Sequence, residues 1–406
     1  MKKITILIFV FLLLQFASLP SSVSADGTYG LFDDLLVLLV GLINSLKKLL
    51  GSIYGLGDID YKDLEDSLKK LDSMGIKVTR EQLVKKANEV SNINKEADGV
   101  WEAKLSFEYL LPEDLKRNLF GKDKNETIEE DEPTTTTVPP YEEPYGKEDE
   151  YVEVKKRETR FKRATTCTYK TEFDSRDAWP KCTSIINNVV NQGQCGSCWA
   201  VSTASAFTDC FCIERAKRGI NTPNDAANTF SALDVLSCSK LFDGCDGGRA
   251  ENAFNWMKNK GVCTGTDYSK PNGCKPYPFE PFGETQKGPK CSNACTNTKW
   301  GTPYKNDKQH DRLRASGSVV AGIDIYSDFD GYKTGVYFKT PGAKKDKYGH
   351  YIVIIGYGTQ TCGNVNTKYW IARNSWGKGF GESGFMKFRR GVNECGIERD
   401  SSYGIP

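Results

Sequence analysis

A chain of 406 residues has room for roughly two or three domains, and a hydrophobic content of 38% is enough for a globular core. The formal net charge is +2, and basic residues are interspersed with acidic ones, so no bulk charge attracts nucleic acid. Composition therefore indicates globular domains and argues against a nucleic-acid partner.

The N-terminal segment 1–25 is typical of a secretory signal. It begins with two lysines, continues with an apolar run from Ile4 to Phe16, and ends in the small residues Val23-Ser24-Ala25, which suit a cleavage site. We therefore expect the chain to enter the secretory pathway and to reach a lysosome or the extracellular space.

The cysteines support an oxidising destination. All 14 lie between Cys167 and Cys395, so the disulfide-bearing domain is predicted to begin near residue 164 and to extend to 406. If one cysteine is a nucleophile, an odd number remains, and at least one more thiol stays reduced or pairs between chains.

The segment 26–120 is predicted to form a helical unit. Leucines repeat at helical spacing over residues 31–50, and further helix starts occur at Tyr61 and Thr79. The apolar run from Leu35 to Ile43 is far shorter than the roughly 20 residues that span a bilayer, so no transmembrane anchor is expected. Packing within this unit is favoured over contact with a membrane surface.

The segment 121–163 is predicted to be a linker. It is acidic, contains a Pro- and Thr-rich run over residues 133–140, and has too few apolar residues to form a core. It carries the glycosylation sequon of Asn125 and ends in the basic run Arg160–Arg163, where processing is favoured over a merely solvated charge run.

Helix and strand patterns separate along the remaining chain. Cys198 to Lys217 has helical spacing and no proline, and Gly219 follows as a stop. Strands are predicted by β-branched and aromatic enrichment at 319–325, 351–357 and 369–373. A helical half followed by a sheet half indicates an α+β fold with a cleft between the halves.

The segment 191–200 presents the main candidate nucleophile, Cys198. A thiol at a helix N-terminus lies at the positive end of the helix dipole, which favours the nucleophilic thiolate. However, Cys195 and Cys198 also form a C-x-x-C pair, which elsewhere is a redox motif or half of a zinc site. The pair alone leaves these alternatives open.

Partners for Cys198 are few, because the chain has only two histidines. His310 lies in a polar run typical of a solvated loop, whereas His350 stands at the start of an apolar strand and is the favoured base. Asn374 can orient it, and Trp376 can shield their hydrogen bond from water. For the oxyanion, the Gln192 side chain and the Cys198 backbone N–H are the candidate donors.

These residues and their order resemble the papain family of cysteine proteases, and within it cathepsin B-like members. The shared motifs are Gln192–Trp199, Gly244–Gly248, Gly349-His350 and Asn374–Gly377, and the resemblance covers residues 173–406. Trp101, Leu115 and Gly121 are similar to the short cathepsin B type of pro-region.

The resemblance implies a papain-like fold with a helical left domain, a β-rich right domain, a cleft between them and a preceding helical pro-region. It implies attack by Cys198, proton transfer by His350, orientation by Asn374, an oxyanion hole at Gln192, and backbone binding of substrate at Gly247 and Gly248. The disulfide pairs that it implies are Cys182–Cys212, Cys195–Cys245, Cys238–Cys291 and Cys274–Cys295. If Cys195 is so engaged, the C-x-x-C is not a redox pair.

The chain departs from cathepsin B at the loop that would occlude the cleft. Residues 275–290 hold neither the loop's own disulfide nor its paired histidines, which clasp a substrate's C-terminal carboxylate. A buried carboxylate without a partner is costly. We therefore expect endopeptidase activity rather than removal of C-terminal dipeptides.

Other departures concern the right domain and specificity. The chain is shorter than its relatives between His310 and Gly317, and Ser318 replaces the usual proline. Tyr351 stands where relatives have a small residue, which predicts a shallow S2 pocket, and Asp400 at its floor favours a basic P2 side chain. The sequence leaves five cysteines unassigned: Cys167, Cys210, Cys263, Cys362 and Cys395.

The sequence thus predicts a monomeric thiol endopeptidase made as a zymogen, with peptide and protein substrates and its own pro-region as inhibitor. By resemblance, cystatin-type inhibitors are expected partners, and no cofactor or metal is expected. Two alternatives remain: a catalytically impaired homologue that binds peptides or inhibitors, and a disulfide-rich structural module, which does not explain the order of the catalytic motifs.

Overall fold

The structure is a computed structural model that describes residues 61–120, 122–123, 167–239, 244–283, 286–292, 295 and 317–402. Several predictions lie outside the described residues: the signal at 1–25, the helix at 31–50, Asn125, the basic run at 160–163, and His310 with the short segment before Gly317.

The pro-region begins with the two helices that its sequence predicts. At the second, Thr79 forms a capping box: its Oγ1 accepts from the Gln82 N–H, and the Gln82 Oε1 accepts from the Thr79 N–H. The described pro-region elements are α3 (Tyr61–Ser73), α4 (Arg80–Glu96), β1 (Trp101–Ala103), α5 (Phe107–Leu110), α6 (Glu113–Lys116) and η1 (Arg117–Leu119). The short strand β2 (Lys122–Asp123) lies within the segment 121–163 that is predicted to be a linker.

The left domain is built around α9, whose bounds Cys198–Lys217 are those predicted. Gly219 follows with φ of 76°, a left-handed conformation that glycine adopts without strain and that ends the helix. The other elements here are α7 (Ser175–Ala178), η2 (Pro180–Cys182), α8 (Thr183–Ile186), η3 (Ala226–Asn228), α10 (Ala232–Cys238), η4 (Gly244–Asp246) and α11 (Ala250–Lys260).

The right domain is a sheet that contains all three predicted strands, at 319–325, 351–357 and 369–373. In the described residues its order is β1-β5-β8-β7-β6-β4-β9, and β2 and β3 also pair with β6. The elements are β3 (Cys167–Asp174), β4 (Val319–Tyr326), η5 (Phe329–Gly331), β5 (Tyr332–Tyr337), β6 (Lys345–Cys362), β7 (Val365–Arg373), β8 (Phe385–Arg389), η6 (Glu394–Gly396) and β9 (Asp400–Ser402).

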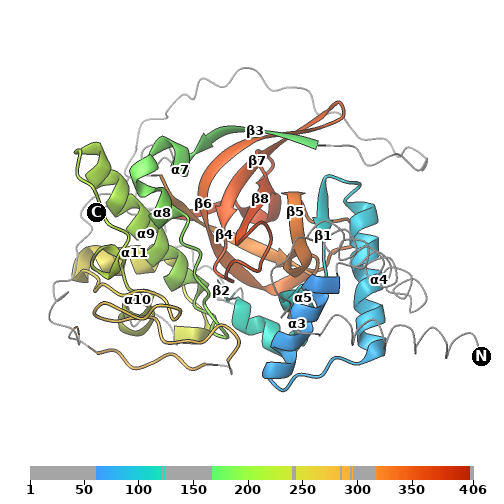
Figure 1. Cartoon of the computed structure of the whole chain (residues 1–406), viewed down its shortest axis with the longest axis horizontal. Coiled ribbons are helices and arrows are strands. Elements are labelled where there is room, and N and C mark those ends of the chain that lie inside the picture. Colours follow the sequence, from blue (N-terminus) through green and yellow to red (C-terminus); the bar gives the residue numbers. More distant parts are fainter. Residues whose placement is uncertain are drawn as a thin grey trace, which may run out of the picture. The chain divides into compact units, whose positions relative to one another are not determined.

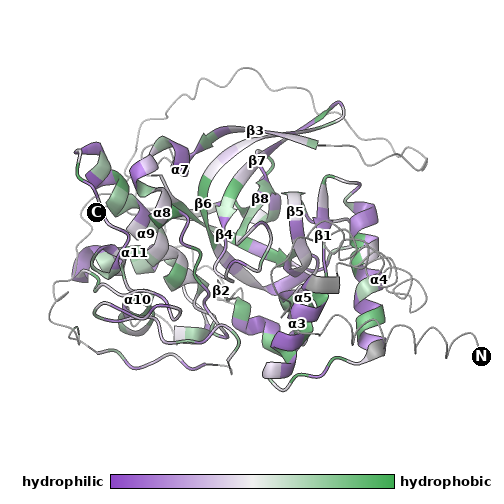
Figure 2. Ribbon diagram, in the orientation of Figure 1, coloured by the Kyte–Doolittle hydropathy of each residue, from purple (hydrophilic) through white to green (hydrophobic). Residues whose placement is uncertain are grey.

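Two hydrophobic cores meet at β6, between the left-domain helices and the pro-region (Figure 1). Because side chains alternate along a strand, Tyr351 and Val353 enter the core around α9, while Ile352 and Ile354 enter a core shared with the pro-region. Figure 2 shows the corresponding hydrophobic residues along the central strands. The pro-region is thus part of the right domain's core rather than a separate appendage.

Five disulfides join described cysteines. Three are the pairs that the resemblance implies, Cys182–Cys212, Cys195–Cys245 and Cys238–Cys291. Cys167 pairs with Cys362, its direct neighbour across β3 and β6.

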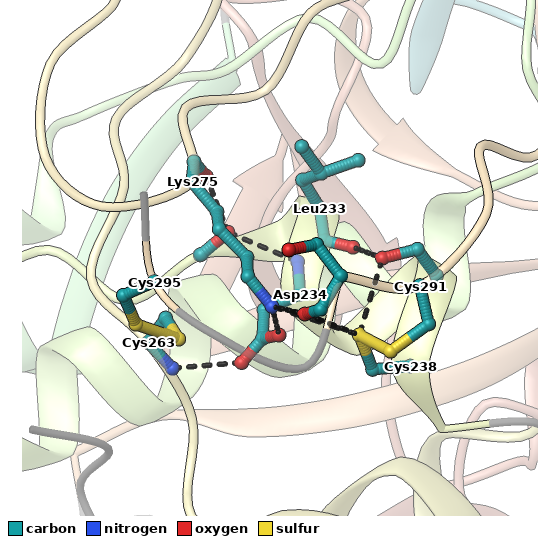
Figure 3. Close-up of a disulfide and its surroundings, with 10 residues drawn as sticks. Leu233, Asp234, Cys238, Cys263, Lys275, Cys291 and Cys295 are labelled. Atoms are coloured by element: carbon teal, nitrogen blue, oxygen red, sulfur yellow. Dashed lines mark hydrogen bonds and ion pairs between the residues drawn. A yellow bond between two sulfur atoms is a disulfide. The ribbon is translucent and has the colours of Figure 1, made fainter. Parts of the chain in front are cut away.

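The predicted pair Cys274–Cys295 is wrong, because Cys295 is bonded to Cys263. The reason is proximity: the sulfurs of Cys263, Cys274 and Cys295, here termed the three-cysteine cluster, all lie within 4.8 Å of one another. Figure 3 shows Cys263–Cys295 and Cys238–Cys291 on either side of a buried ion pair, in which Lys275 Nζ lies 2.5 Å from Asp234 Oδ1. Asp234 also accepts from the Cys263 backbone N–H, so one carboxylate holds both chain segments together.

Candidate active site

Cys198 is the first residue of α9, is fully buried, and takes part in no disulfide. The neighbouring Cys195–Cys245 disulfide holds the preceding loop, so the two cysteines of the C-x-x-C have different surroundings. Gly196 has no room for a side chain: an added Cβ would lie 2.3 Å from the Cys245 carbonyl oxygen and 2.5 Å from that of Phe120 in the pro-region. The loop therefore presents a helix N-terminus to a closely approaching peptide backbone.

His350 and Asn374 form a hydrogen bond of 2.7 Å between His350 Nε2 and Asn374 Oδ1. Asn374 Oδ1 also accepts from the Ser375 backbone N–H at 2.8 Å, which fixes the amide orientation. Since that oxygen accepts, Nε2 carries the proton in the neutral ring, and Nδ1 keeps its lone pair. Nδ1 is buried and has no hydrogen-bond partner in the described part of the chain, as a base awaiting a proton requires.

Aromatic rings enclose this imidazole. The Trp376 ring lies 4.9 Å from that of His350, and the rings of Phe120 and Phe329 lie 6.1 and 6.2 Å away, as measured between centroids. Burial lowers the pKa of His350 from 6.5 to about 4, because a desolvated ring disfavours the charged form, while the bond to Asn374 acts in the opposite direction. His350 is therefore neutral while the pro-region covers it.

Gln192 is held so that its side-chain amide points toward the pro-region backbone. Ser375 Oγ donates to Gln192 Oε1 at 2.6 Å, and Gln192 Nε2 donates to the carbonyl of Leu119 at 3.2 Å and that of Cys195 at 2.9 Å. Trp376 Nε1 also donates to the Leu119 carbonyl, at 3.3 Å. The carbonyl of Leu119 in the pro-region thus accepts from the amide that the sequence predicts as the donor to a substrate oxyanion.

The end of the pro-region and the strand β2 lie over the candidate residues. Phe120 is buried against His350 and Trp376, and β2 pairs antiparallel with β6, where Lys122 lies opposite Gly349. Further along, the Phe107 ring packs edge-on against Phe282 at 5.1 Å. The chain therefore covers His350 with a phenyl ring and places peptide backbone against the loop that precedes Cys198.

A buried ion pair joins the helix that carries Cys198 to the strand that precedes Asn374. Arg373 Nη2 lies 2.8 Å from Asp209 Oδ2, and both side chains are at least 97% buried. Ser318 Oγ donates to the same carboxylate at 2.7 Å. Ser318 thus has a structural role, and the described right domain keeps His350 and Asn374 hydrogen-bonded.

The predicted substrate-binding residues occupy distinct places. Gly247 has φ of 129°, and a Cβ on Gly248 would lie 2.4 Å from the Trp199 ring, so neither position accommodates an ordinary side chain without strain. Tyr351 is buried against the left domain. Asp400 lies opposite Gly322, which lies opposite Tyr351, so the three residues form one row across β9, β4 and β6.

Sequence reasoning missed Ser375 and Tyr277, both of which bond Gln192. Ser375 lies inside the motif that supplied Asn374, so the signal was present. Tyr277 lies within residues 275–290, far in sequence from Gln192, and nothing in the neighbouring sequence indicates this contact.

A comparison with protein-family models matches residues 169–405 to the papain family cysteine proteases. The chain belongs to the papain family. Its fold has the helical and β-rich halves of that family, with a helical region before the catalytic domain.

Curated relatives place this papain-family protease among cathepsin B-like enzymes. It is 40% identical over 264 residues to cathepsin B-like cysteine proteinase 4 of Caenorhabditis elegans, covering 58% of this chain and 74% of that protein. It is also 40% identical over 249 residues to a gut-specific cysteine proteinase of the same organism, covering 56% of this chain and 70% of that protein.

A solved structure extends the likeness into the pro-region. The proCathepsin B S9 from Trypanosoma congolense has a TM-score of 0.56 and 26% identity, covering 79% of this chain and 97% of that one. The protein is thus a cathepsin B-like cysteine peptidase, a hydrolase. Within the described residues, no helix combines the length and apolar character needed to cross a bilayer.

Proposed function

We propose that this protease hydrolyses peptide bonds with Cys198 as nucleophile, His350 as proton shuttle, Asn374 as its orienting group and Gln192 as oxyanion donor. His350 Nδ1 takes the proton of the Cys198 thiol, the resulting thiolate attacks the scissile carbonyl carbon, and Gln192 with the Cys198 N–H binds the oxyanion. His350 protonates the leaving amine as the C–N bond breaks. His350 then deprotonates water, which attacks the acyl carbon and releases the acid and the thiolate.

The observation that carries the proposal is the position of the Leu119 carbonyl. It accepts hydrogen bonds from Gln192 and from Trp376, so the pro-region backbone meets one of the two donors proposed for a substrate oxyanion. The adjacent Phe120 covers His350. The pro-region is accordingly proposed as the inhibitor of its own enzyme, which is made as a zymogen.

Replacing the thiol tests the nucleophile. Cys198→Ala is expected to abolish turnover and labelling by thiol-directed epoxides. Cys210→Ala is the matched control, because Cys210 is also buried on α9 and outside any disulfide. Substantial cleavage by the Cys198→Ala protein would refute the assignment.

We further propose endopeptidase activity. Residues 275–290 contain no histidine, and among the described residues Tyr277–Phe282 pack against the active-site loop and the pro-region. A cavity of about 220 Å³ beside Trp376 is lined by Lys378, but also by Asp267, which offsets that charge near a C-terminal carboxylate. Internally quenched peptides with free and amidated C-termini should be cut equally well, whereas strong release of C-terminal dipeptides would contradict the proposal.

For specificity, we propose a shallow S2 pocket bounded by Tyr351 that favours a basic P2 residue through Asp400. The row across β6, β4 and β9 supports this, because Gly322 between them leaves no side chain to separate the two positions. A peptide library should show Arg or Lys at P2, and Asp400→Asn should reduce that preference without changing hydrolysis of peptides with apolar P2 residues.

The route of the zymogen is proposed from its sequence. The signal at 1–25 directs the protein to a lysosome or outside the cell, and Asn125 is glycosylated on the way. Cleavage at 160–163 then frees the catalytic unit. This unit acts as a monomer and binds cystatin-type inhibitors. N-terminal sequencing of secreted protein tests the cleavage position.

The alternative of a catalytically impaired homologue has less support. It was motivated by the short segment before Gly317 and by Tyr351, yet the His350–Asn374 bond is formed and Ser318 is bonded in the interior. Single-turnover acylation of processed protein distinguishes the two, because an impaired homologue would bind peptide without releasing amine.

A further inference from the structure

A tyrosine hydroxyl connects both ends of the loop that carries the oxyanion donors. Tyr277 is 4% exposed, and its hydroxyl lies 2.8 Å from the Gln192 carbonyl oxygen and 2.6 Å from Ser197 Oγ. Gln192 supplies the side-chain amide, and Ser197 immediately precedes Cys198, whose N–H is the second donor. The hydroxyl therefore bridges the two residues on which the spacing of those donors depends.

The direction of these hydrogen bonds follows from their chemistry. A carbonyl oxygen can only accept, so Tyr277 donates to Gln192, and its oxygen then accepts from the Ser197 hydroxyl. The competing acceptor of Ser197, the Cys195 carbonyl, is 3.4 Å away. Burial raises the pKa of Tyr277, the hydrogen bond with Ser197 lowers it, and negative charge on Cys198 raises it; the net shift is upward, so the hydroxyl is protonated at neutral pH.

The rest of the segment also packs across this loop. A Cβ on Gly193 would lie 2.6 Å from the Glu280 carbonyl oxygen, and the Gln286 N–H donates to the Gln194 carbonyl at 3.0 Å. Tyr277 itself packs edge-on against Phe279 at 5.1 Å. Contacts at three places hold the loop, but only the tyrosine hydroxyl bonds both of its ends.

We propose that Tyr277 is a positioning residue for acyl transfer, whose hydroxyl sets the separation between the Gln192 amide and the Cys198 N–H. This rests on the proposed roles of Gln192 and Cys198. Without the hydroxyl, Gln192 keeps its bonds to Ser375, but its carbonyl and the Ser197 hydroxyl are left buried without that partner. The two donors then no longer converge on the oxyanion, and a misplacement of about 1 Å costs up to about a hundredfold in rate.

The test is Tyr277→Phe in enzyme processed from the full chain, compared with Tyr332→Phe. Tyr332 is also fully buried, and its hydroxyl bonds the Gly335 carbonyl and the Lys387 N–H within the right-domain sheet, away from the loop that carries the oxyanion donors. We expect kcat for peptides to fall at least about tenfold in Tyr277→Phe with KM within about twofold, and to change less than about threefold in Tyr332→Phe.

Alkylation by iodoacetamide separates positioning from damage to the thiol, because it consumes the thiolate without forming an oxyanion. Its rate constant at Cys198 should change less than about twofold in Tyr277→Phe. In a Gln192→Ala background, Tyr277→Phe should have little further effect, since the donor that it positions is gone. Ser197→Ala, which removes the other partner, should lower kcat in the same selective way if Tyr277→Phe does not fold.

Unchanged kcat in Tyr277→Phe, or a parallel fall in alkylation and turnover, would overturn the role of Tyr277. Failure of the proposed function looks different: turnover would survive Cys198→Ala, or alkylation of Cys198 would leave the wild-type enzyme active.

Discussion

Acid should weaken the closed zymogen through one residue, His350. Its pKa is about 4 in the covered state and 6.5 in the ordinary solvated ring. Between these values the unfolded chain binds a proton that the folded chain does not, so stability rises with pH across the window and is lost as pH falls from 6.5 to 4. The difference of roughly 2.5 pKa units corresponds to about 3 kcal/mol at full loss.

The assay uses full-length Cys198→Ala protein, which cannot cleave itself, and its partner Cys198→Ala/His350→Gln. Urea unfolding at pH 7 and pH 4.5 should show a pH-dependent loss about 2 to 3 kcal/mol larger in the protein that keeps His350. Burial raises the pKa values of carboxyls such as Glu108 and Asp330, so their contribution to stability falls as pH rises. This contribution is the same in both proteins. The difference between their pH-dependent losses of stability therefore reports on His350 alone.

Proton NMR gives a direct check, because the chain has only two histidines and the His350→Gln variant assigns the remaining ring. A zymogen His350 pKa of 6 or above, or identical pH dependence of the two proteins, would refute the reasoning.

Three further perturbations test the surroundings of the site. Lys275→Met leaves the Asp234 carboxylate buried without its cation and should lower the free energy of unfolding by about 3–5 kcal/mol, measured in urea. Phe120→Ala removes the ring over the imidazole and should speed thiol labelling of the uncleaved zymogen at least about tenfold. Cys263→Ser should transfer the cluster's disulfide to Cys274, as seen by peptide mapping.

Each has a matched control. Lys275→Met with Asp234→Asn should regain much of the lost stability, since no buried charge remains. Phe282→Ala changes a ring that packs on Phe107 of the pro-region rather than on the imidazole, and should speed labelling less. A wild-type peptide map that links Cys274 to Cys295 would contradict the structure's pairing.

Part of the arrangement of this site could be predicted from sequence because its signals are local. Helical spacing after Cys198 predicted α9 with its bounds. The scarcity of histidine narrowed the base to two candidates, and β6 explains the choice: alternation places His350 with Ile352 on the face of the strand that meets Trp376 and Phe329.

Contacts between distant segments could not be predicted in this way. Cys167 and Cys362 are neighbours only because β3 and β6 pair in one register, across 195 residues of sequence. In the three-cysteine cluster, the sulfurs of Cys263 and Cys274 both lie within 4.8 Å of that of Cys295, and the resemblance named Cys274 where the structure pairs Cys263. Tyr277 carried no local signal, because its partners lie 80 and 85 positions earlier in the chain.

Inhibition and pH response have a common structural origin in two consecutive residues. Leu119 supplies the carbonyl that engages Gln192, and Phe120 supplies the ring that desolvates His350. Since these residues are adjacent, we expect movement of one to displace the other, so that the proposed oxyanion donor and the proposed base are uncovered together. Protonation of His350 therefore disfavours the bound position of both Leu119 and Phe120. Release of these two residues would expose the proposed donor Gln192 and the proposed base His350 in one step.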